Sequence, residues 1–244
     1  MVDLDRYLPQ ILALIDKSYV NISNILPSEW CEQNRIIGGD GNSALKGRFS
    51  YKNTPYCREV VDFLHPSNPF KYCATMKGSQ SGFSTGVIEP GIGWMIDCNP
   101  ANTMFLVGTA DLVKESVEKL DSLFDNTGIR EKGLIRSNSK KARNTKTGDT
   151  DARKDYPGGH LTINSLNFKN LRNVSMQNVF ADDLDAMKSV SKEDGDIISM
   201  IEKRTTAFKD KKKVSYISTP TVKGYSTIEK EYLKGDQRKY HMPC

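Results

Sequence analysis

The sequence contains no long apolar run, and this absence argues against a membrane-spanning helix. A helix that crosses a bilayer needs about 20 consecutive apolar residues, and no stretch of the chain approaches that length. Residues 1–15 also lack the basic head and small-residue cleavage site of a secretory signal peptide. We therefore expect a protein that stays in a cytoplasm and has no membrane partner.

Cysteine is scarce, and the few cysteines are scattered along the chain. The chain contains five cysteines and no CxxC pair: Cys31, Cys57, Cys73, Cys98 and Cys244. In a reducing compartment such side chains are mostly small buried hydrophobes. Cys244 differs from the others because it is the last residue, and a chain that ends Met-Pro-Cys looks interrupted.

The overall composition is that of a globular protein. Of 244 residues, 37% are hydrophobic and 27% are charged, which is enough for a sizeable core in one large domain or two small ones. The formal charge is +5 and the isoelectric point is about 8.8. This mild basicity fits a nucleic-acid partner, but many ordinary proteins are as basic, so it decides little.

The periodicity of apolar residues predicts an alternation of strands and helices. Helices are predicted at 4–15, from Pro27 with Ser28 as a candidate cap, at 55–64, in the segment up to Ile96, and at 112–124, 191–208 and 225–233. Strands are predicted at 70–76, 103–108, 161–163, 174–181 and 214–218. Residues 137–154 are polar and basic, as in a long loop or an exposed hairpin. The alternation indicates an α/β fold, with a mostly parallel sheet covered on both faces.

The segment Lys77–Ser84, Lys-Gly-Ser-Gln-Ser-Gly-Phe-Ser, lies between a predicted strand and a predicted helix, as a phosphate loop does. Compared with G-x-x-x-x-G-K-[ST], Gly82 and Ser84 are in register, whereas Lys77 occupies the first glycine position and Phe83 the lysine position. A lysine stem is long enough to reach back to the phosphates. Backbone amides would hold those phosphates and Ser84 would bind Mg²⁺. An ordinary strand-to-helix turn has a similar composition.

Acidic residues follow the predicted strand at 174–181. Asp182, Asp183 and Asp185 come at its end. In a phosphate-loop ATPase such a strand lies beside the phosphate loop, its first acid binds Mg²⁺ through water, and the next polarises the attacking water. We assign these two roles to Asp182 and Asp183. The alternative is a solvated loop after a strand.

The last predicted strand ends in Ser218-Thr-Pro-Thr221. Its hydroxyl groups would lie at the carboxyl edge of the sheet, where open α/β sheets bind ligands. Such a group can sense the terminal phosphate of a nucleotide. A turn started by Ser/Thr-Pro is the alternative.

Together and in this order, these segments resemble the large terminase subunit of lambda-type tailed phages, from about Leu26 to Cys244. Further matching pieces are Ser28-Glu-Trp30, Thr54-Pro-Tyr56 with Arg58-Glu59, Tyr156-Pro-Gly-Gly159 and Asp236-Gln-Arg-Lys-Tyr-His-Met-Pro-Cys244. The displaced lysine of the phosphate loop is itself a mark of terminases. The resemblance implies a P-loop NTPase of the ASCE type that hydrolyses ATP.

The resemblance also implies roles for individual residues. Lys77 would be the Walker A lysine, Asp182 the Walker B magnesium acid and Asp183 the catalytic carboxylate. Thr219 would belong to the motif that couples hydrolysis to movement. Tyr56 would lie near the adenine, where its ring can stack, although an aromatic residue at a helix start more usually belongs to the core. The residues expected to contact nucleotide are Tyr56, Lys77, Gly78, Ser79, Gln80, Ser81, Gly82, Phe83, Ser84 and Thr85.

Three departures from the family pattern matter. The family usually has glutamate where this chain has Asp183, so the water could be poorly positioned and turnover slow. Gln80 stands where some relatives carry an arginine, so the transition-state arginine would come from Arg172, Arg204 or a neighbouring subunit, although a structural ion pair is the commoner role for both. Relatives continue past Cys244 with a second cysteine, a lid and a nuclease, so we expect a truncated ATPase part without zinc.

The resemblance implies ATP and Mg²⁺ as ligands, and double-stranded DNA, the small terminase subunit, the portal and other copies of the chain as partners, in the host-cell cytoplasm. We expect a helical appendage at 1–50 and an ATPase core at 51–244. A helicase-like ATPase is one alternative, which the displaced lysine argues against. A catalytically weak or inactive module that binds nucleotide and docks on partners is the other.

A basic segment is a candidate DNA contact. Its cations are Lys140, Lys141, Arg143, Lys146, Arg153 and Lys154, interspersed with acids at 149, 151 and 155. A packaging motor grips phosphates without reading the base sequence, so basic loops suit it. A solvated surface loop is the alternative, since the acids dilute the positive field.

Overall fold

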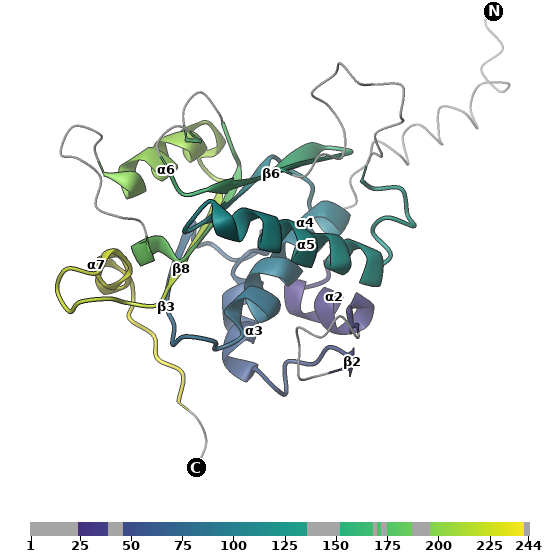
Figure 1. Ribbon diagram of the computed structural model, residues 1–244, viewed down its shortest axis with the longest axis horizontal. Coiled ribbons are helices and arrows are strands. Elements are labelled where there is room, and N and C mark those ends of the chain that lie inside the picture. The colour runs from purple at the N-terminus through teal and green to yellow at the C-terminus, as the bar shows by residue number, and fades with distance from the viewer. Residues whose placement is uncertain are drawn as a thin grey trace, which may run out of the picture.

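The computed structural model describes residues 24–38, 46–135, 152–167, 170–171, 175–186 and 196–241 (Figure 1). The predicted α/β fold is confirmed. Six strands form one sheet in the order β3 (Tyr72–Met76), β8 (Lys213–Ser218), β7 (Asn178–Asp182), β4 (Thr103–Val107), β6 (Gly159–Ser165) and β5 (Arg153–Tyr156). All neighbouring pairs are parallel except β5 with β6. The carboxyl ends of five strands therefore meet at one edge of the sheet.

Helices cover both faces of this sheet. On one side lie α2 (Pro27–Asn34), α3 (Pro55–Asp62), α4 (Glu89–Cys98) and α5 (Asp111–Asn126), and on the other lie α6 (Ile197–Thr205) and α7 (Thr227–Lys234) (Figure 1). Shorter elements are a π-helix at Ser84–Ile88, 3-10 helices at Leu184–Ala186 and Thr206–Phe208, and the paired strands β1 (Ile36–Ile37) and β2 (Gly47–Arg48).

Alternation along the strands divides the core into two layers. Phe105, Val107, Phe180 and Ile217 belong to the cluster packed against α2–α5. Their neighbours Met104, Leu106, Val179 and Tyr216 belong to the cluster packed against α6 and α7. Successive strand side chains point to opposite faces, so strands buried on both faces read as continuous apolar runs.

Helix α2 packs tightly on α4. Trp30 is 2% exposed, and its indole nitrogen donates a hydrogen bond to Asp97 at 2.8 Å. A Cβ atom added to Gly93 would lie 2.5 Å from the Trp30 ring, so only glycine allows this approach. The expected role of Ser28 is wrong. Leu26 is the N-cap of α2, and Ser28 instead donates its N–H and hydroxyl to the Asp62 carboxylate, both at 2.8 Å.

The basic segment was expected to be a long loop or an exposed hairpin, and the structure describes only its end, which forms one strand of an antiparallel hairpin. Arg153 and Lys154 lie in β5, which pairs with β6. Lys154 Nζ is 3.0 Å from Asp121 Oδ1 with its side chain 3% exposed, and Arg153 pairs with Asp155 at 2.9 Å. Lys154 is therefore buried in an ion pair with α5, whereas the Arg153 side chain is 37% exposed, and the proposed DNA contact stays a prediction. The other four cations, and the predicted helix at 4–15, lie outside the described residues.

Candidate nucleotide-binding site

The three segments that carry the predicted chemistry meet at the carboxyl edge of the sheet. The phosphate loop follows β3, the acids follow β7 and the Ser-Thr-Pro segment follows β8. The end of the acidic strand was expected to lie beside the phosphate loop, and Lys77 Nζ of that loop is 3.8 Å from Asp182 Oδ1, although β8 lies between β3 and β7 in the sheet. The ends are nonetheless level, since Met76 pairs with Ser218 and Asp182 with Ile217. The N–H of Lys77 donates to the carbonyl of Ser218 at 3.0 Å, joining loop and strand.

The phosphate loop is exposed along its backbone and fixed at its ends. Gln80 and Gly82 adopt positive φ angles of 53° and 75°, and Gly78, Ser79 and Gln80 are exposed. The Ser81 hydroxyl donates to the carbonyl of Gly78 at 2.7 Å. Such turns of successive backbone amides form concave anion sites.

Aromatic side chains anchor this loop to the core. Phe83 is 8% exposed and belongs to the core. Tyr56, at the start of α3, lies 5.7 Å from the Phe83 ring and 5.8 Å from the Tyr240 ring. Its hydroxyl donates to the carbonyl of Ser81 at 2.9 Å. Tyr56 therefore contacts the phosphate loop itself, while its proposed contact with adenine stays a prediction.

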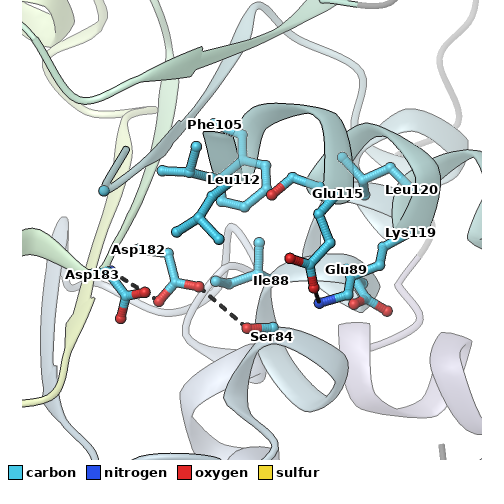
Figure 2. A pocket seen from close by; sticks show the side chains of 13 residues that line it. Ser84, Ile88, Glu89, Phe105, Leu112, Glu115, Lys119, Leu120, Asp182 and Asp183 are labelled. Carbon is cyan, nitrogen blue, oxygen red and sulfur yellow. Dashed lines mark hydrogen bonds and ion pairs between the residues drawn. The ribbon is translucent and has the colours of Figure 1, made fainter. Parts of the chain in front are cut away.

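Ser84 and Asp182 bring two oxygen donors together, as Figure 2 shows. The Ser84 hydroxyl donates to Asp182 Oδ2 at 3.2 Å. Burial of the Asp182 side chain, which is 13% exposed, raises the pKa of its carboxyl, and the charge of Lys77 opposes this rise. A hydroxyl and one carboxylate are the oxygen ligands that Mg²⁺ accepts when substrate phosphates and water complete its coordination. The donor set therefore fits Mg²⁺.

Lys77 converges on the same acids. Its Nζ atom lies 3.4 Å from Asp183 Oδ1 and 3.8 Å from Asp182 Oδ1, with the lysine side chain 11% exposed. The displaced lysine thus reaches the carboxyl end of β7, although β8 lies between β7 and the strand that precedes Lys77. A cation in this place can neutralise either the acids or the phosphates of a bound nucleotide.

Asp183 has an uncommon backbone conformation. Its φ angle is +54°, a left-handed geometry that aspartate tolerates better than most residues. Its backbone N–H donates to Asp182 Oδ1 at 3.0 Å, which holds the Asp182 carboxylate against the backbone of Asp183. Gly108, just after β4, allows the close approach, because an added Cβ would lie 3.1 Å from both the Cβ and the carbonyl oxygen of Asp183.

The third acid, Asp185, is structural. Its carboxylate accepts the Ser226 hydroxyl and the N–H of Thr227 at the start of α7. Its own N–H donates to the Ser218 hydroxyl at 3.0 Å. Ser218 is 1% exposed, so it ties the acidic turn to the segment that carries Thr219.

A cavity of about 110 Å³ adjoins Ser84, Asp182 and Asp183. In Figure 2 the side chains of Glu115 and Lys119 on α5 close its far side, and Glu89 lies below them. Glu89 was not predicted as a site residue, although its place directly before Pro90 at the start of α4 is visible in the sequence. Its carboxylate pairs with Arg35, and both side chains are buried.

One candidate for the transition-state arginine lies far from this edge. The carbonyl of Arg204 accepts the N–H of Met176, which precedes β7. Strands rise about 3.3 Å per residue, so Arg204 lies at the opposite edge of the sheet from Asp182. Arg172 is outside the described residues, and an arginine from a neighbouring subunit stays a prediction.

Comparison with known proteins identifies the family and the fold of the chain. Residues 43–244 match the family described as phage terminase large subunit gpA, ATPase domain. The large terminase of bacteriophage HK97 aligns with a TM-score of 0.60 and 11% identity, over 85% of this chain and 40% of that one. This likeness shows a shared fold. No curated protein sequence matches the chain.

Two further solved structures align less closely. The ATPase domain of the Thermus phage P74-26 large terminase has a TM-score of 0.48 at 16% identity, over 70% of this chain and 67% of that one. The large terminase of a thermophilic bacteriophage has a TM-score of 0.49 at 14% identity, over 76% of this chain and 41% of that one. The chain thus spans about two fifths of the HK97 protein and of this last terminase. In the part that the structure describes, no helix is long and apolar enough to cross a membrane.

Proposed function

Because the chain belongs to the family of phage terminase large-subunit ATPase domains, we propose that the edge formed by β3, β8 and β7 binds and hydrolyses ATP with Mg²⁺. The observation that carries this proposal is the convergence of Lys77 with Ser84, Asp182 and Asp183. A cation, a hydroxyl and two carboxylates meet beside an exposed loop of backbone amides, which is the set that phosphoryl transfer to water requires.

Each residue then has a distinct task. Amides of residues 78–84 would hold the phosphates, and Lys77 would leave the acids to contact them. Ser84 and Asp182 would hold Mg²⁺, which when bound neutralises charge on the phosphate oxygens. Asp183, fixed by its N–H on Asp182, would orient the attacking water. Ser218 links the loop to the acidic turn, and this link supports the proposal that Thr219 beside it responds to the nucleotide.

Within a whole terminase this reaction would drive double-stranded DNA into the capsid. The partners we propose are the small terminase subunit, the portal and further copies of the chain, in the cytoplasm of the host cell. The cations at 140, 141, 143 and 146 are the part of the basic segment that would contact DNA phosphates.

A nucleotide-binding module with little turnover is the second candidate. The ion pair between Lys77 and Asp183 favours it, because the acid that would orient water is engaged with the loop lysine. Asp183 is also one methylene shorter than the glutamate usual in the family. The two candidates differ in turnover and agree in Mg²⁺-dependent nucleotide binding.

The test is ATP binding and hydrolysis by this chain with and without Mg²⁺. Lys77→Ala should abolish binding. Lys71→Ala is the matched control, because Lys71 lies just before the other end of β3, where it donates to the carbonyl of Asp210. Retained affinity in Lys77→Ala would remove the phosphate-loop assignment. Binding without turnover, even with the other motor components present, would favour the second candidate.

A further inference from the structure

The helix that follows the phosphate loop begins with an uncommon wide turn. Residues Ser84–Ile88 form a π-helix, and the N–H of Glu89 donates to the carbonyl of Ser84, five residues back. Such turns are rare and are found mostly as single turns at functional sites. Here the wide turn begins at the residue whose hydroxyl contacts Asp182.

The sequence leaves two carbonyls of this turn in need of donors. Pro90 has no N–H, so position 90 cannot donate to the carbonyl of Gly86 in an α-helix or to that of Thr85 in a π-helix. Both carbonyls receive side-chain donors from an earlier part of the chain. The Tyr51 hydroxyl donates to the carbonyl of Gly86 at 2.8 Å, and the Arg35 guanidinium donates to the carbonyl of Thr85.

These donors belong to one packed unit, which we call the N-terminal clamp: Arg35, Phe49 and Tyr51. The Arg35 guanidinium lies 5.4 Å from the centre of the Phe49 ring, and the Phe49 ring meets the Tyr51 ring edge to face at 4.8 Å. The N–H of Tyr51 donates to the Glu32 carboxylate of α2 at 2.8 Å. The clamp is therefore supported by α2 and by the pairing of β1 with β2.

The clamp also reaches the cavity beside the acids. The second arm of Arg35 pairs with Glu89, with side chains 9% and 8% exposed, and Glu89 lines the cavity together with Ser84 and Asp182. Breaking a buried pair by removing one partner leaves an uncompensated charge. One arginine thus fixes both the carbonyl next to Ser84 and an acid of the cavity.

We propose that Arg35 and Tyr51 are positioning residues that hold the π-turn and so set Ser84 at the magnesium site. This inference rests on the proposed function. Each helical residue turns the chain by about 100°. Loss of the extra residue of the π-turn would rotate Ser84 by about that angle relative to α4, away from Asp182. The clamp spans the proposed boundary between the appendage at 1–50 and the core at 51–244.

The test compares ATP affinity with and without Mg²⁺ in Tyr51→Phe, which removes one hydroxyl. We expect the gain in affinity from Mg²⁺ to fall about tenfold, the size set by an unsatisfied buried carbonyl, while Mg²⁺-free affinity, carried by Lys77 and the loop amides, changes little. Tyr156→Phe is the matched control, because it removes another buried hydroxyl that donates to a backbone carbonyl, that of Ala101, at 2.7 Å.

Arg35→Lys provides a second variant if Tyr51→Phe is too unstable to measure. Lysine keeps the charge for Glu89 but lacks the forked guanidinium that reaches two acceptors, so it should lose Mg²⁺ dependence in the same way. Excess Mg²⁺ should restore turnover in either variant, whereas a general loss of stability would lower both affinities together.

Two negative outcomes separate the inference from the proposed function. If wild-type chain binds Mg²⁺-ATP through Lys77 and Asp182 while Tyr51→Phe and Arg35→Lys keep the wild-type Mg²⁺ gain, the clamp has no positioning role. If wild-type chain binds no ATP at all, the proposed function is wrong and the inference fails with it.

Discussion

Lys77 Nζ lies 3.4 Å from Asp183 Oδ1 across 106 positions of sequence. The lysine comes from the loop after β3 and the acid from the turn after β7, with β8 between them. This pair links the group proposed to hold phosphate with the group proposed to orient water. Nucleotide binding must therefore compete with an existing ion pair.

Replacing Asp183 by glutamate tests whether reach or backbone geometry limits the reaction. A glutamate carboxylate extends one methylene further toward a water, so we expect Asp183→Glu to raise the rate of ATP hydrolysis. The φ angle of +54° is less favourable for glutamate than for aspartate, so the free energy of unfolding should fall by about 1 kcal/mol. Single-turnover hydrolysis and thermal unfolding measure the two effects. A lower rate would show that the site is built around aspartate.

Asp182→Asn should separate metal binding from nucleotide binding. Asparagine keeps the shape and one acceptor oxygen but lacks the charge that attracts a divalent cation. We expect affinity for Mg²⁺-ATP to fall toward that for free ATP, as seen by titration calorimetry at several Mg²⁺ concentrations. Asp185→Asn is the control. Because Asp185 holds the start of α7, this change should lower stability and leave the ratio of the two affinities unchanged. An unchanged ratio in Asp182→Asn would rule out the magnesium role.

Mg²⁺-ATP affinity should depend on pH through Asp182. Burial raises the pKa of this carboxyl above its ordinary 3.8, with Lys77 opposing the rise. A proton competes with Mg²⁺, so affinity is full above the raised pKa and is lost as pH falls through it, at a higher pH than for an exposed aspartate. Lys77→Ala should move the Asp182 titration, followed by carboxyl NMR, to still higher pH. A titration at or below 3.8 would contradict this.

Gly93→Ala should destabilise the contact of α2 with α4. The new methyl group would lie 2.5 Å from the Trp30 ring, and such overpacking costs about 1–3 kcal/mol, more than alanine gains in helix propensity. Trp30→Phe removes the ring atoms that clash, so the double variant should lose less than the sum of the single losses. Denaturant unfolding of the four proteins measures this coupling. If the losses of the two single variants simply add, then α2 moves away from the new methyl group and the predicted clash with Trp30 does not occur.

Neutralising Lys140, Lys141, Arg143 and Lys146 tests the DNA proposal. Each phosphate contact contributes about 0.9 to the slope of log affinity against log salt, so the slope should fall by up to about 4. Lys230→Ala with Lys234→Ala, on α7, is the control and should leave the slope unchanged. An unaltered slope in the fourfold variant would contradict the DNA proposal and favour an ordinary solvated loop.

Sequence reasoning identified the segments that meet at the proposed site because each segment is local in sequence. The run Lys77–Ser84 and the acids at 182 and 183 are contiguous segments next to strands, so composition and periodicity predicted the elements that carry them. The roles of these residues stay predictions. The role of Asp185 was not predicted, because its partners Ser226 and Thr227 lie more than 40 positions away. The burial of Lys154 was not predicted either, because its ion-pair partner Asp121 lies in α5, far away in the sequence.

The amino-acid sequence by itself determined the α/β alternation, the Gly- and Ser-rich loop after β3 and the acidic strand end, because apolar periodicity and short motifs act within one element. Tertiary structure alone decided that β8 lies between β3 and β7, that Lys77 meets Asp183, and that Arg35 and Tyr51 satisfy the carbonyls left open beside Pro90. Strand order and side-chain partners depend on contacts between distant segments, which only the packing of the whole chain selects.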